Sequence, residues 1–382
     1  MNVITEAIKK TNVYFCLDCG KCTSICPVAL RNSDFSPRSI IGKAVHLSQE
    51  DFLKDNLLWE CLTCRTCRER CPSDVYFSGF IRDVRFEAAK LGNRTECSHG
   101  GALQSLMRIM TKPNIQQNRL DWITPNLRTS QDSEYLYFVG CSPYFNVFFN
   151  NLDLKTIDTA KSTVKILNYL GIKPVIMDNE RCCGHDLLWT GDIENFKKLA
   201  EHNIREIEKT GCKKIIVSCP ECYTALKVDY PKYFYDLGVD VIHISEILVE
   251  NITNNKLKFK RFRKKLKVTY QDPCRLGRYS GIYEEPREVI RAIEGLEFID
   301  MPRSRKGAIC CGTSAWANCN SVSKQIQVDR LKEAKSTKAD YLITACSKCE
   351  IHFKCAMSDE NISSDAKINL LDLTTLAAER LK

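Results

Sequence analysis

The sequence lacks any stretch that would carry it into or across a membrane. No apolar run approaches the roughly 18 residues of a membrane-spanning helix. The first residues, MNVITEAIKK, have neither the apolar core nor the small-residue cleavage site of a secretory signal peptide. We therefore expect a cytoplasmic protein with no membrane span of its own.

The composition also lacks the low hydrophobicity of a disordered chain and the repeats of a fibre. Hydrophobic residues make up 44% and charged residues 27% of the 382 residues, which is typical of soluble globular proteins. A chain of this length can bury a substantial core and form two or three domains.

The positive formal charge does not indicate a nucleic-acid-binding protein. The value of +9 counts each of the 22 cysteines as a neutral thiol. If most of them are deprotonated ligands, and a [4Fe-4S] cubane with its four thiolates carries about minus two, much of the excess positive charge disappears. We expect no nucleic-acid partner.

The cysteines indicate metal or redox chemistry rather than disulfides, because cytosolic thiols are kept reduced. Two adjacent pairs, Cys182-Cys183 and Cys310-Cys311, support this interpretation. Neighbouring Cα atoms lie about 3.8 Å apart, so a disulfide within such a pair would be strained. Each pair is followed by glycine, and an unusual feature that occurs twice needs a common explanation.

The first eight cysteines form two dense runs, CLDCGKCTSICP at 16–27 and CLTCRTCRERCP at 61–72. Apolar residues between and after the runs recur at helical spacing, which predicts a small, mostly helical domain over 1–95. The pattern C-x2-C-x2-C-x3-C-P is typical of proteins with two [4Fe-4S] cubanes, in which the fourth cysteine of each run reaches the other cluster. On that rule the ligands of one cubane are Cys16, Cys19, Cys22 and Cys71, and those of the other are Cys61, Cys64, Cys67 and Cys26.

Zinc is the alternative for these thiolates, since thiolate sites select zinc as well as iron and sulfide. A structural zinc site needs only four thiolates from paired C-x2-C motifs. It does not require a third cysteine three residues further on, nor a proline after the fourth. The two runs therefore favour iron–sulfur clusters over a zinc-binding interaction module.

A polar connecting segment over 96–132, with one predicted helix at 101–110, precedes a change of pattern. From 133 onward, short β-branched and aromatic runs alternate with helical periods, which is typical of βαβ units on a parallel sheet. The pattern occurs twice, over 133–258 and 259–382. The predicted fold class is therefore α/β, with a helical dicluster domain followed by two repeated units.

Each predicted unit carries the same arrangement of five cysteines. In the first unit the predicted strand EYLYFVG ends at one cysteine, PVIM (174–177) leads to the adjacent pair, and KKIIVS ends at a C-x2-C motif. The first set is Cys141, Cys182, Cys183, Cys219 and Cys222, and the second is Cys274, Cys310, Cys311, Cys346 and Cys349. Two sets that match this closely form an internal repeat.

The five thiolates of each set should converge, because the carboxyl ends of parallel strands meet at one edge of a sheet. Five ligands exceed the four of a tetrahedral zinc site or a cubane, which favours a multi-iron centre of unusual shape. Pro220 at the start of a helix would place the C-x2-C sulfurs at a helix N-terminus, where thiolate is favoured. Gly184 and Gly312 would let the backbone approach the centre closely.

A strongly basic segment, KLKFKRFRKKLK at 256–267, lies between the two units. One interpretation is a solvated hinge or strand edge. The other is a docking surface for an acidic partner.

The cysteine motifs resemble those of the heterodisulfide reductases. The adjacent pair, with the C-x2-C motif that follows it, is similar to the cysteine-rich CCG domain, present here twice. LWECLTCRTCRERCPSDV (58–75) looks like the C subunit of heterodisulfide reductase. A dicluster domain followed by two CCG units is similar to the arrangement in the D subunit, a fusion of the C and B subunits, and the resemblance covers nearly the whole chain.

The resemblance implies a noncubane [4Fe-4S] cluster on the five cysteines of each unit. It further implies that two cubanes pass electrons to these clusters, which cleave a disulfide such as that of coenzyme M and coenzyme B to two thiols. The partners implied are a cytochrome b-like subunit or a flavin-containing A-like subunit, and the first of these would bring the chain to a membrane.

The resemblance leaves a second function open. Iron–sulfur subunits of glycolate, lactate and glycerol-3-phosphate dehydrogenases share the same parts, so an electron-transfer subunit is the alternative. Both sets of five cysteines are complete here, which favours the reductase. This chain departs from the usual family pattern in QDPCR, in CCGTSAW, and in having CSKC where its first unit has CPEC, and these departures put the identity of the substrate in doubt.

Several further residues have two interpretations. His185 follows the first pair and would donate a proton to a departing thiolate, or would serve only as a hydrogen-bonding core residue. Trp189 and Trp316 are typical of core packing or of a pocket wall. Arg275 and Arg278, with the basic group at 301–306, would receive an anionic substrate or lie solvated on the surface. We assign no site to the remaining cysteines, which are Cys97, Cys212, Cys319 and Cys355.

Overall fold

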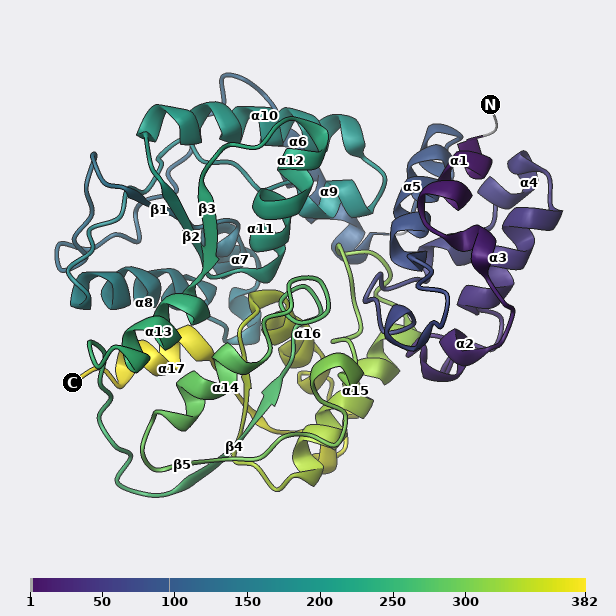
Figure 1. Cartoon of the computed structure of the whole chain (residues 1–382). Coiled ribbons are helices and arrows are strands. Elements are labelled where there is room, and N and C mark those ends of the chain that lie inside the picture. The colour runs from purple at the N-terminus through teal and green to yellow at the C-terminus, as the bar shows by residue number, and fades with distance from the viewer. Residues whose placement is uncertain (1–2, 96) are drawn as a thin grey trace.

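The part of the chain that carries the first eight cysteines is helical, as predicted. The computed structural model describes residues 3–95 and 97–382 (Figure 1); residues 1, 2 and 96, at which the predicted domain and connecting segment begin, lie outside this range. The helices of this part are α1 (Val3–Lys10), α2 (Lys21–Ile25), α3 (Pro37–His46), α4 (Gln49–Leu53) and α5 (Phe77–Lys90). In Figure 1 they form a separate lobe at one end of the molecule.

The connecting segment contains the predicted helix as α6 (Ala102–Ile109) and leads into a parallel sheet. The strands of this sheet, in the spatial order β1-β2-β3, are β1 (Tyr135–Phe138), β2 (Lys214–Val217) and β3 (Asp240–His243). The helices around it are α7 (Ser142–Phe148), α8 (Thr156–Tyr169), α9 (His185–Trp189), α10 (Ile193–Thr210), α11 (Pro220–Thr224), α12 (Tyr230–Tyr233) and α13 (Ile244–Thr253).

A second parallel sheet follows, in the spatial order β5-β4-β6-β7. Its strands are β4 (Leu266–Gln271), β5 (Leu296–Phe298), β6 (Tyr341–Thr344) and β7 (Asn369–Asp372). The helices are α14 (Glu284–Arg291), α15 (Ser321–Ser336), α16 (Ser347–Met357) and α17 (Leu373–Glu379). The alternation of parallel strands and helices confirms the predicted α/β class.

The segment at 174–177 is not the strand that its sequence predicts. Only Val175 pairs, exchanging backbone hydrogen bonds with Tyr135 and Tyr137 at 2.8 and 2.9 Å. Pro174 has no N–H to extend the ladder. Val175 nevertheless lies next to β1. It occupies the position in the first sheet that β5 occupies next to β4 in the second. The two sheets therefore have the same spatial order.

The two units exchange their last helices. Helix α13, which follows the last strand of the first sheet, packs against α14 of the second unit, while α17 at the end of the chain packs against α8 of the first. Figure 1 shows these helices between the two sheets. One continuous apolar core therefore includes residues of both units.

The basic segment at 256–267 runs along the surface before it enters β4. Leu257 and Phe259 are buried and fix it to the protein, while the basic side chains between them are exposed. The segment is not a sheet edge, because β4 has a neighbouring strand on each side. Among the described residues, no helix combines the length and the apolar character needed to cross a bilayer.

Candidate functional site

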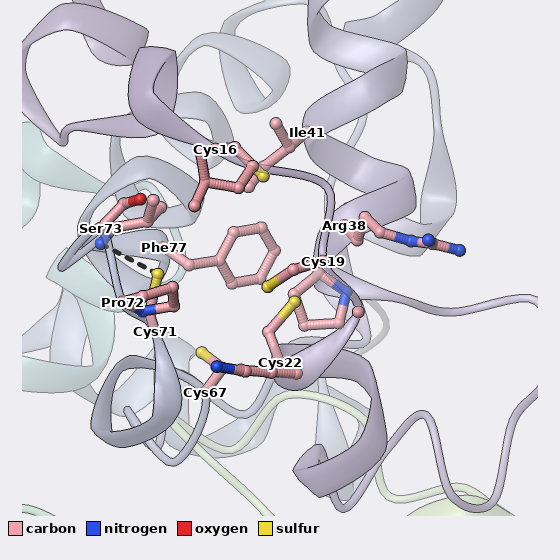
Figure 2. Close-up of a pocket in the computed structure, with 15 residues that line it drawn as sticks. Cys16, Cys19, Cys22, Arg38, Ile41, Cys67, Cys71, Pro72, Ser73 and Phe77 are labelled. Atoms are coloured by element: carbon pink, nitrogen blue, oxygen red, sulfur yellow. Dashed lines mark hydrogen bonds between the residues drawn. The ribbon is translucent and has the colours of Figure 1, made fainter.

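Cysteine sulfurs line two cavities in the N-terminal lobe. Figure 2 shows cysteines of both runs around the first cavity. The cysteines of the first cavity are Cys16, Cys19, Cys22, Cys67 and Cys71. Those of the second are Cys26, Cys61, Cys64 and Cys67. Cysteines that the ferredoxin rule assigns to one cluster therefore line the same cavity, and Cys67 borders both.

Residues with positive φ bend both cysteine runs around their cavities. Asp18 (φ 49°) and Gly20 (φ 75°) flank the second cysteine of the first run, and Thr63 (φ 48°) and Arg65 (φ 64°) flank the matching cysteine of the second. Left-handed backbone costs a non-glycine residue about 1–2 kcal/mol. The bend turns the Thr63 N–H toward Cys61 Sγ at 3.3 Å, a hydrogen bond that suits a thiolate ligand of a cluster.

The two cavities differ in their access to solvent. Cys19 at the first cavity is exposed, and so are the neighbouring Tyr14 (80%) and Leu17 (68%). Cys64 at the second cavity is buried, and burial raises the pKa of the Cys61 thiol to about 11. A metal centre that binds these cysteines must displace the thiol protons. An iron–sulfur cluster binds thiolates strongly enough to do so, and a weakly bound ion does not.

In each repeat, the five predicted cysteines lie beside one another in an unbroken chain. In the first set the chain runs through Cys141, Cys182, Cys183, Cys222 and Cys219. In the second it runs through Cys274, Cys310, Cys311, Cys349 and Cys346. Five sulfurs in one place exceed the ligands of a four-coordinate zinc ion and suit a multi-iron centre.

A buried carboxylate joins two of the cysteine-bearing loops in the first unit. Glu180 accepts a hydrogen bond from the backbone N–H of Gly140 at 2.7 Å and another from Arg119 at 2.6 Å. Burial raises the pKa of Glu180 to about 6, although Arg119 opposes this shift. Since Gly140 precedes Cys141 and Glu180 lies two residues before Cys182, these bonds hold the two thiols together.

The glycines after the adjacent pairs let two helices pack against the loops of the pairs. A Cβ at Gly184 (φ 78°) would lie 2.8 Å from a phenylalanine ring carbon of α10, and one at Gly312 (φ 90°) would lie 2.7 Å from the Ser323 backbone oxygen of α15. The Gly184 N–H also donates to Cys182 Sγ at 3.4 Å. Gly140 lies next to a thiol as well, since a Cβ there would lie 2.9 Å from Cys222 Sγ. The close approach of Gly184 and Gly312 to a cluster stays a prediction.

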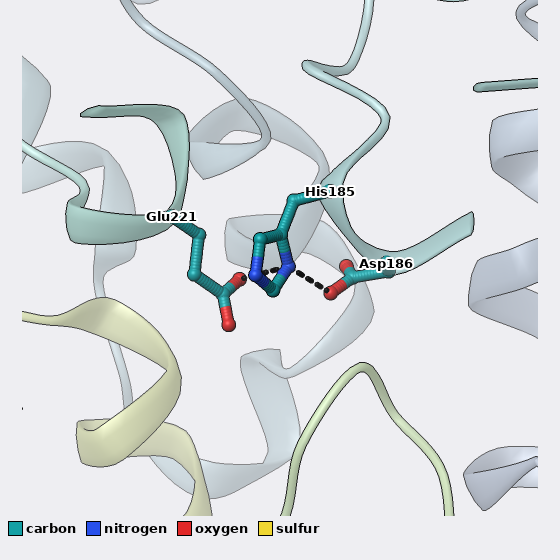
Figure 3. A group of neighbouring side chains, drawn as sticks. All are labelled: His185, Asp186 and Glu221. Carbon is teal, nitrogen blue, oxygen red and sulfur yellow. Dashed lines mark hydrogen bonds and ion pairs between the residues drawn. The ribbon is translucent and has the colours of Figure 1, made fainter. Parts of the chain in front are cut away.

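A buried charge cluster joins the two repeats beside the five-cysteine sets. The Lys348 ammonium contacts Asp186 and lies 2.5 Å from Glu221 Oε2. Figure 3 shows the His185 ring between the two carboxylates, with Nδ1 at 3.1 Å from Asp186 Oδ1 and 3.5 Å from Glu221 Oε2. Because Lys348 already supplies a cation to both carboxylates, we assign no metal ion to this group.

Glu221 and Lys348 occupy the same position of the repeated C-x2-C motif. The motif reads Cys-Pro-Glu-Cys in the first unit and Cys-Ser-Lys-Cys in the second. Opposite charges at matching positions let the two copies pair with each other, which identical copies would not do. Although burial opposes its charge, Asp186 and Glu221 raise the pKa of Lys348 well above the ordinary value, so the ammonium stays charged.

Five buried polar atoms near this cluster have no hydrogen-bond partner among the residues that the structure describes. They are His185 Nε2, His352 Nε2, Trp189 Nε1, Trp316 Nε1 and Arg275 Nη1. The His352 ring lies 5.2 Å from Trp316, and the Arg275 guanidinium lies 4.0 Å from Trp189. Buried polar groups are normally paired, so these atoms indicate a place for a bound polar molecule or water. Both tryptophans are fully buried, as core packing predicts.

His352 is a site residue that the sequence interpretation missed. Its Nδ1 lies 3.4 Å from Cys311 Sγ. Burial, together with the charge of Lys348, lowers the pKa of His352 to about 3, so the ring is neutral at ordinary pH. The spacing contained a signal, because His352 follows Cys349 by three residues and therefore lies on the same face of α16.

The predicted surface location of two arginines is wrong. Arg275 and Arg278 are only 3% and 8% exposed. Arg275 lies between the rings of Trp189 and Tyr279, at 4.0 Å from each centroid. Trp189 comes from the other repeat, which the sequence around Arg275 does not reveal, whereas Tyr279 lies four residues further along the chain. Arg305 of the basic group at 301–306 is partly exposed and ion-paired, as a surface residue would be.

Two family comparisons agree with this geometry. The family described as "Cysteine-rich domain" (CCG) matches residues 135–227 and again 268–354, and the "4Fe-4S dicluster domain" matches 12–75. The D subunit of the dihydromethanophenazine:CoB–CoM heterodisulfide reductase of Methanosarcina barkeri is 28% identical over 98% of this chain and 95% of its own length. The chain is a homologue of this D subunit. It is an iron–sulfur oxidoreductase of the heterodisulfide reductase type, and it has both kinds of cysteine-rich domain.

Other relatives carry different names. The B subunit of fumarate reductase (CoM/CoB) of Methanothermobacter marburgensis is 27% identical over 95% of this chain and 72% of its own. The EtfAB:quinone oxidoreductase of Syntrophomonas wolfei is 27% identical over 78% of this chain and 43% of its own. A hypothetical protein from Helicobacter pylori has a similar fold, with a TM-score of 0.50 and 12% identity over 90% of this chain and 66% of that one.

The packing at Gly312 predicts a large loss of stability for Gly312→Ala. Both the left-handed φ and the clash with α15 oppose the added methyl group. Gly281 is a matched control, because it has a φ of 77° with open space around it. We expect Gly281→Ala to cost about 1–2 kcal/mol and Gly312→Ala clearly more, in anaerobic chemical denaturation. Equal losses would contradict the packing role.

The charge cluster predicts that Lys348→Met destabilises the fold by about 3–5 kcal/mol, because two buried carboxylates lose their cation. Lys354→Met changes a partly exposed lysine on the same helix and is the control. Adding Glu221→Gln to Lys348→Met should restore part of the loss, as coupled residues do in a double-mutant cycle. Additive losses in the free energy of unfolding would contradict the pairing of the repeats.

Proposed function

We propose that the chain is the catalytic subunit of a heterodisulfide reductase-type complex. Two cubane [4Fe-4S] clusters would be held in the N-terminal cavities, by the four cysteines of each predicted set. Two noncubane [4Fe-4S] clusters would be held by the five-cysteine sets. The observation that carries the proposal is a buried interface beside two complete five-cysteine sets, which the Lys348–Glu221 pair joins and which has unpaired polar atoms among the described residues.

The clusters, when bound, supply one-electron transfer and iron sites with affinity for sulfur. Reduction of a disulfide consumes two electrons and two protons and yields two thiols. The protein must therefore hold the disulfide between the two sets, exclude water and deliver protons to the departing sulfurs. The buried interface around Trp189 and Trp316 meets the second requirement, because both rings are closed to solvent.

His185 is the residue that we propose as proton donor. Its Nδ1 bonds to Asp186, which fixes the orientation of the ring, while its buried Nε2 has no partner among the described residues. Lys348 holds Asp186 in place from the other repeat. The Nε2 atom is thus free to hold a proton beside the first cysteine set and to transfer it to a thiolate.

The second candidate function is an electron-transfer subunit that passes electrons to another carrier. The similarity to the EtfAB:quinone oxidoreductase over 78% of the chain favours it. In either case a partner must exchange electrons with the cluster in the first cavity, where Cys19 is exposed. Partners of the cytochrome b-like or flavin-containing A-like type would meet the chain there. The test is whether the protein reduces a disulfide by itself.

Cluster binding predicts about sixteen iron and sixteen acid-labile sulfide atoms per chain, four of each for every cluster. Changing Cys64 to serine should remove about four of each, because one cubane loses a buried ligand. Changing Cys212, which borders neither cavity and belongs to neither five-cysteine set, should leave the content unchanged. Zinc alone in stoichiometric amount would contradict the assignment.

Disulfide reduction predicts that the anaerobic protein oxidises a reduced viologen dye when given the coenzyme M–coenzyme B disulfide. His185→Gln should lower this rate about 100-fold with cluster content unchanged. His202→Gln is the control, since His202 lies on α10 and its Nε2 bonds to the backbone oxygen of Asn179. If no small disulfide supports the reaction while all clusters are loaded, the chain is the electron-transfer subunit instead.

A further inference from the structure

Three buried arginines contact the loop from Cys61 to Cys64, which lines the second cavity of the N-terminal lobe. Arg85 is fully buried, Arg275 is 3% exposed and Arg278 is 8% exposed. They come from different parts of the chain, since Arg85 lies on α5 while Arg275 and Arg278 follow Cys274 in the second repeat. All three reach the loop that carries Cys61 and Cys64.

Their hydrogen bonds hold this loop in place. Arg85 Nη2 donates to the backbone oxygen of Cys61 at 2.7 Å, and Arg278 Nε donates to that of Cys64 at 2.5 Å. Arg275 Nη2 donates to Thr63 Oγ1 at 2.9 Å. Three guanidinium groups therefore contact three of the four residues from Cys61 to Cys64.

None of these arginines has a described carboxylate within 4.0 Å. Most other buried arginines do have such partners, as Arg119 pairs with Glu180 and Arg287 with Asp272, although Arg181 beside Cys182 has no described one. A buried charge without an ion pair costs several kcal/mol. The three cations thus favour an anionic group in the adjoining second cavity, and a cubane with four thiolates carries about minus two.

Among the described residues, no buried arginine or lysine lines the first cavity. Lys21 lines it but is exposed. Arg38 also lines it, but its side chain is 46% exposed and pairs with Asp18 at 3.2 Å. Solvent and the carboxylate screen that charge. The two cavities therefore differ in electrostatic environment although their cysteine motifs are alike.

We propose that Arg85, Arg275 and Arg278 raise the reduction potential of a cluster in the second cavity above that of a cluster in the first. The inference rests on the cluster binding proposed above. Each reduction adds one negative charge, which nearby buried cations stabilise and which burial alone would disfavour. One electron then moves from the first cluster to the second, with no bond formed or broken. The second cluster lies on the side of the lobe that faces Cys274 and Cys310. In this electron transfer the arginines are positioning and tuning residues, which act through their charge and their hydrogen bonds to the loop of Cys61 and Cys64.

The test is a redox titration of the full chain followed by electron paramagnetic resonance, with iron and sulfide determined on each sample. Arg275→Gln and Arg278→Gln should shift one cubane midpoint to a more negative potential and leave the other unchanged. Arg275→Lys keeps the charge and should keep the native midpoint. Arg38→Gln should leave both midpoints unchanged.

Arg275→Gln is the safer variant for folding, because Arg275 makes a single hydrogen bond and glutamine can still donate to Thr63. Unchanged midpoints in both glutamine variants would overturn the proposal. Equal shifts in Arg275→Gln and Arg275→Lys would assign the effect to hydrogen bonding and would overturn it as well. If the native chain binds no cubane, the cluster assignment itself fails, which the iron and sulfide content shows separately.

Discussion

The ammonium group of Lys348 is the contact on which the arrangement of the two repeats depends. It lies between Asp186 and Glu221, which stand beside the cysteines of the other repeat. A buried charge of this kind is tolerated only when it is paired. The pairing therefore requires both repeats to be folded and in register. The exchange of α13 and α17 between the units also requires both repeats to be folded, because these helices complete the shared apolar core.

Local sequence could predict the parts of the fold that depend on short patterns. The strand EYLYFVG and the cysteine after it are adjacent in the chain, so β1 and Cys141 follow from alternation and from the parallel-sheet rule. The proline of Cys-Pro-Glu-Cys indicates the start of a helix, and α11 begins at Pro220. Even the internal repeat is visible, because the cysteine spacing is preserved.

Other parts depend on contacts between distant residues and leave no local signal. Arg275 bonds to Thr63 across 212 positions of the sequence, so its burial could not be seen from the polar residues around it. The pair at Glu221 and Lys348 shows in the sequence only as a departure between two motifs. The absence of a strand at 174–177 has a local cause, which is Pro174. The prediction gave more weight to the β-branched residues that follow this proline.

The repeats are alike in topology but not in their position relative to the N-terminal lobe. Cys310, Cys311, Cys346 and Cys349 of the second set share an apolar core with Cys26 and Cys64 of the lobe, whereas Cys182, Cys183 and Cys222 of the first set lie in the other core. The lobe does contact the first repeat, since Arg85 donates a hydrogen bond to the backbone oxygen of Trp189. Two cysteine sets of the same composition thus differ in their surroundings, because the core of the lobe is continuous with only one of them.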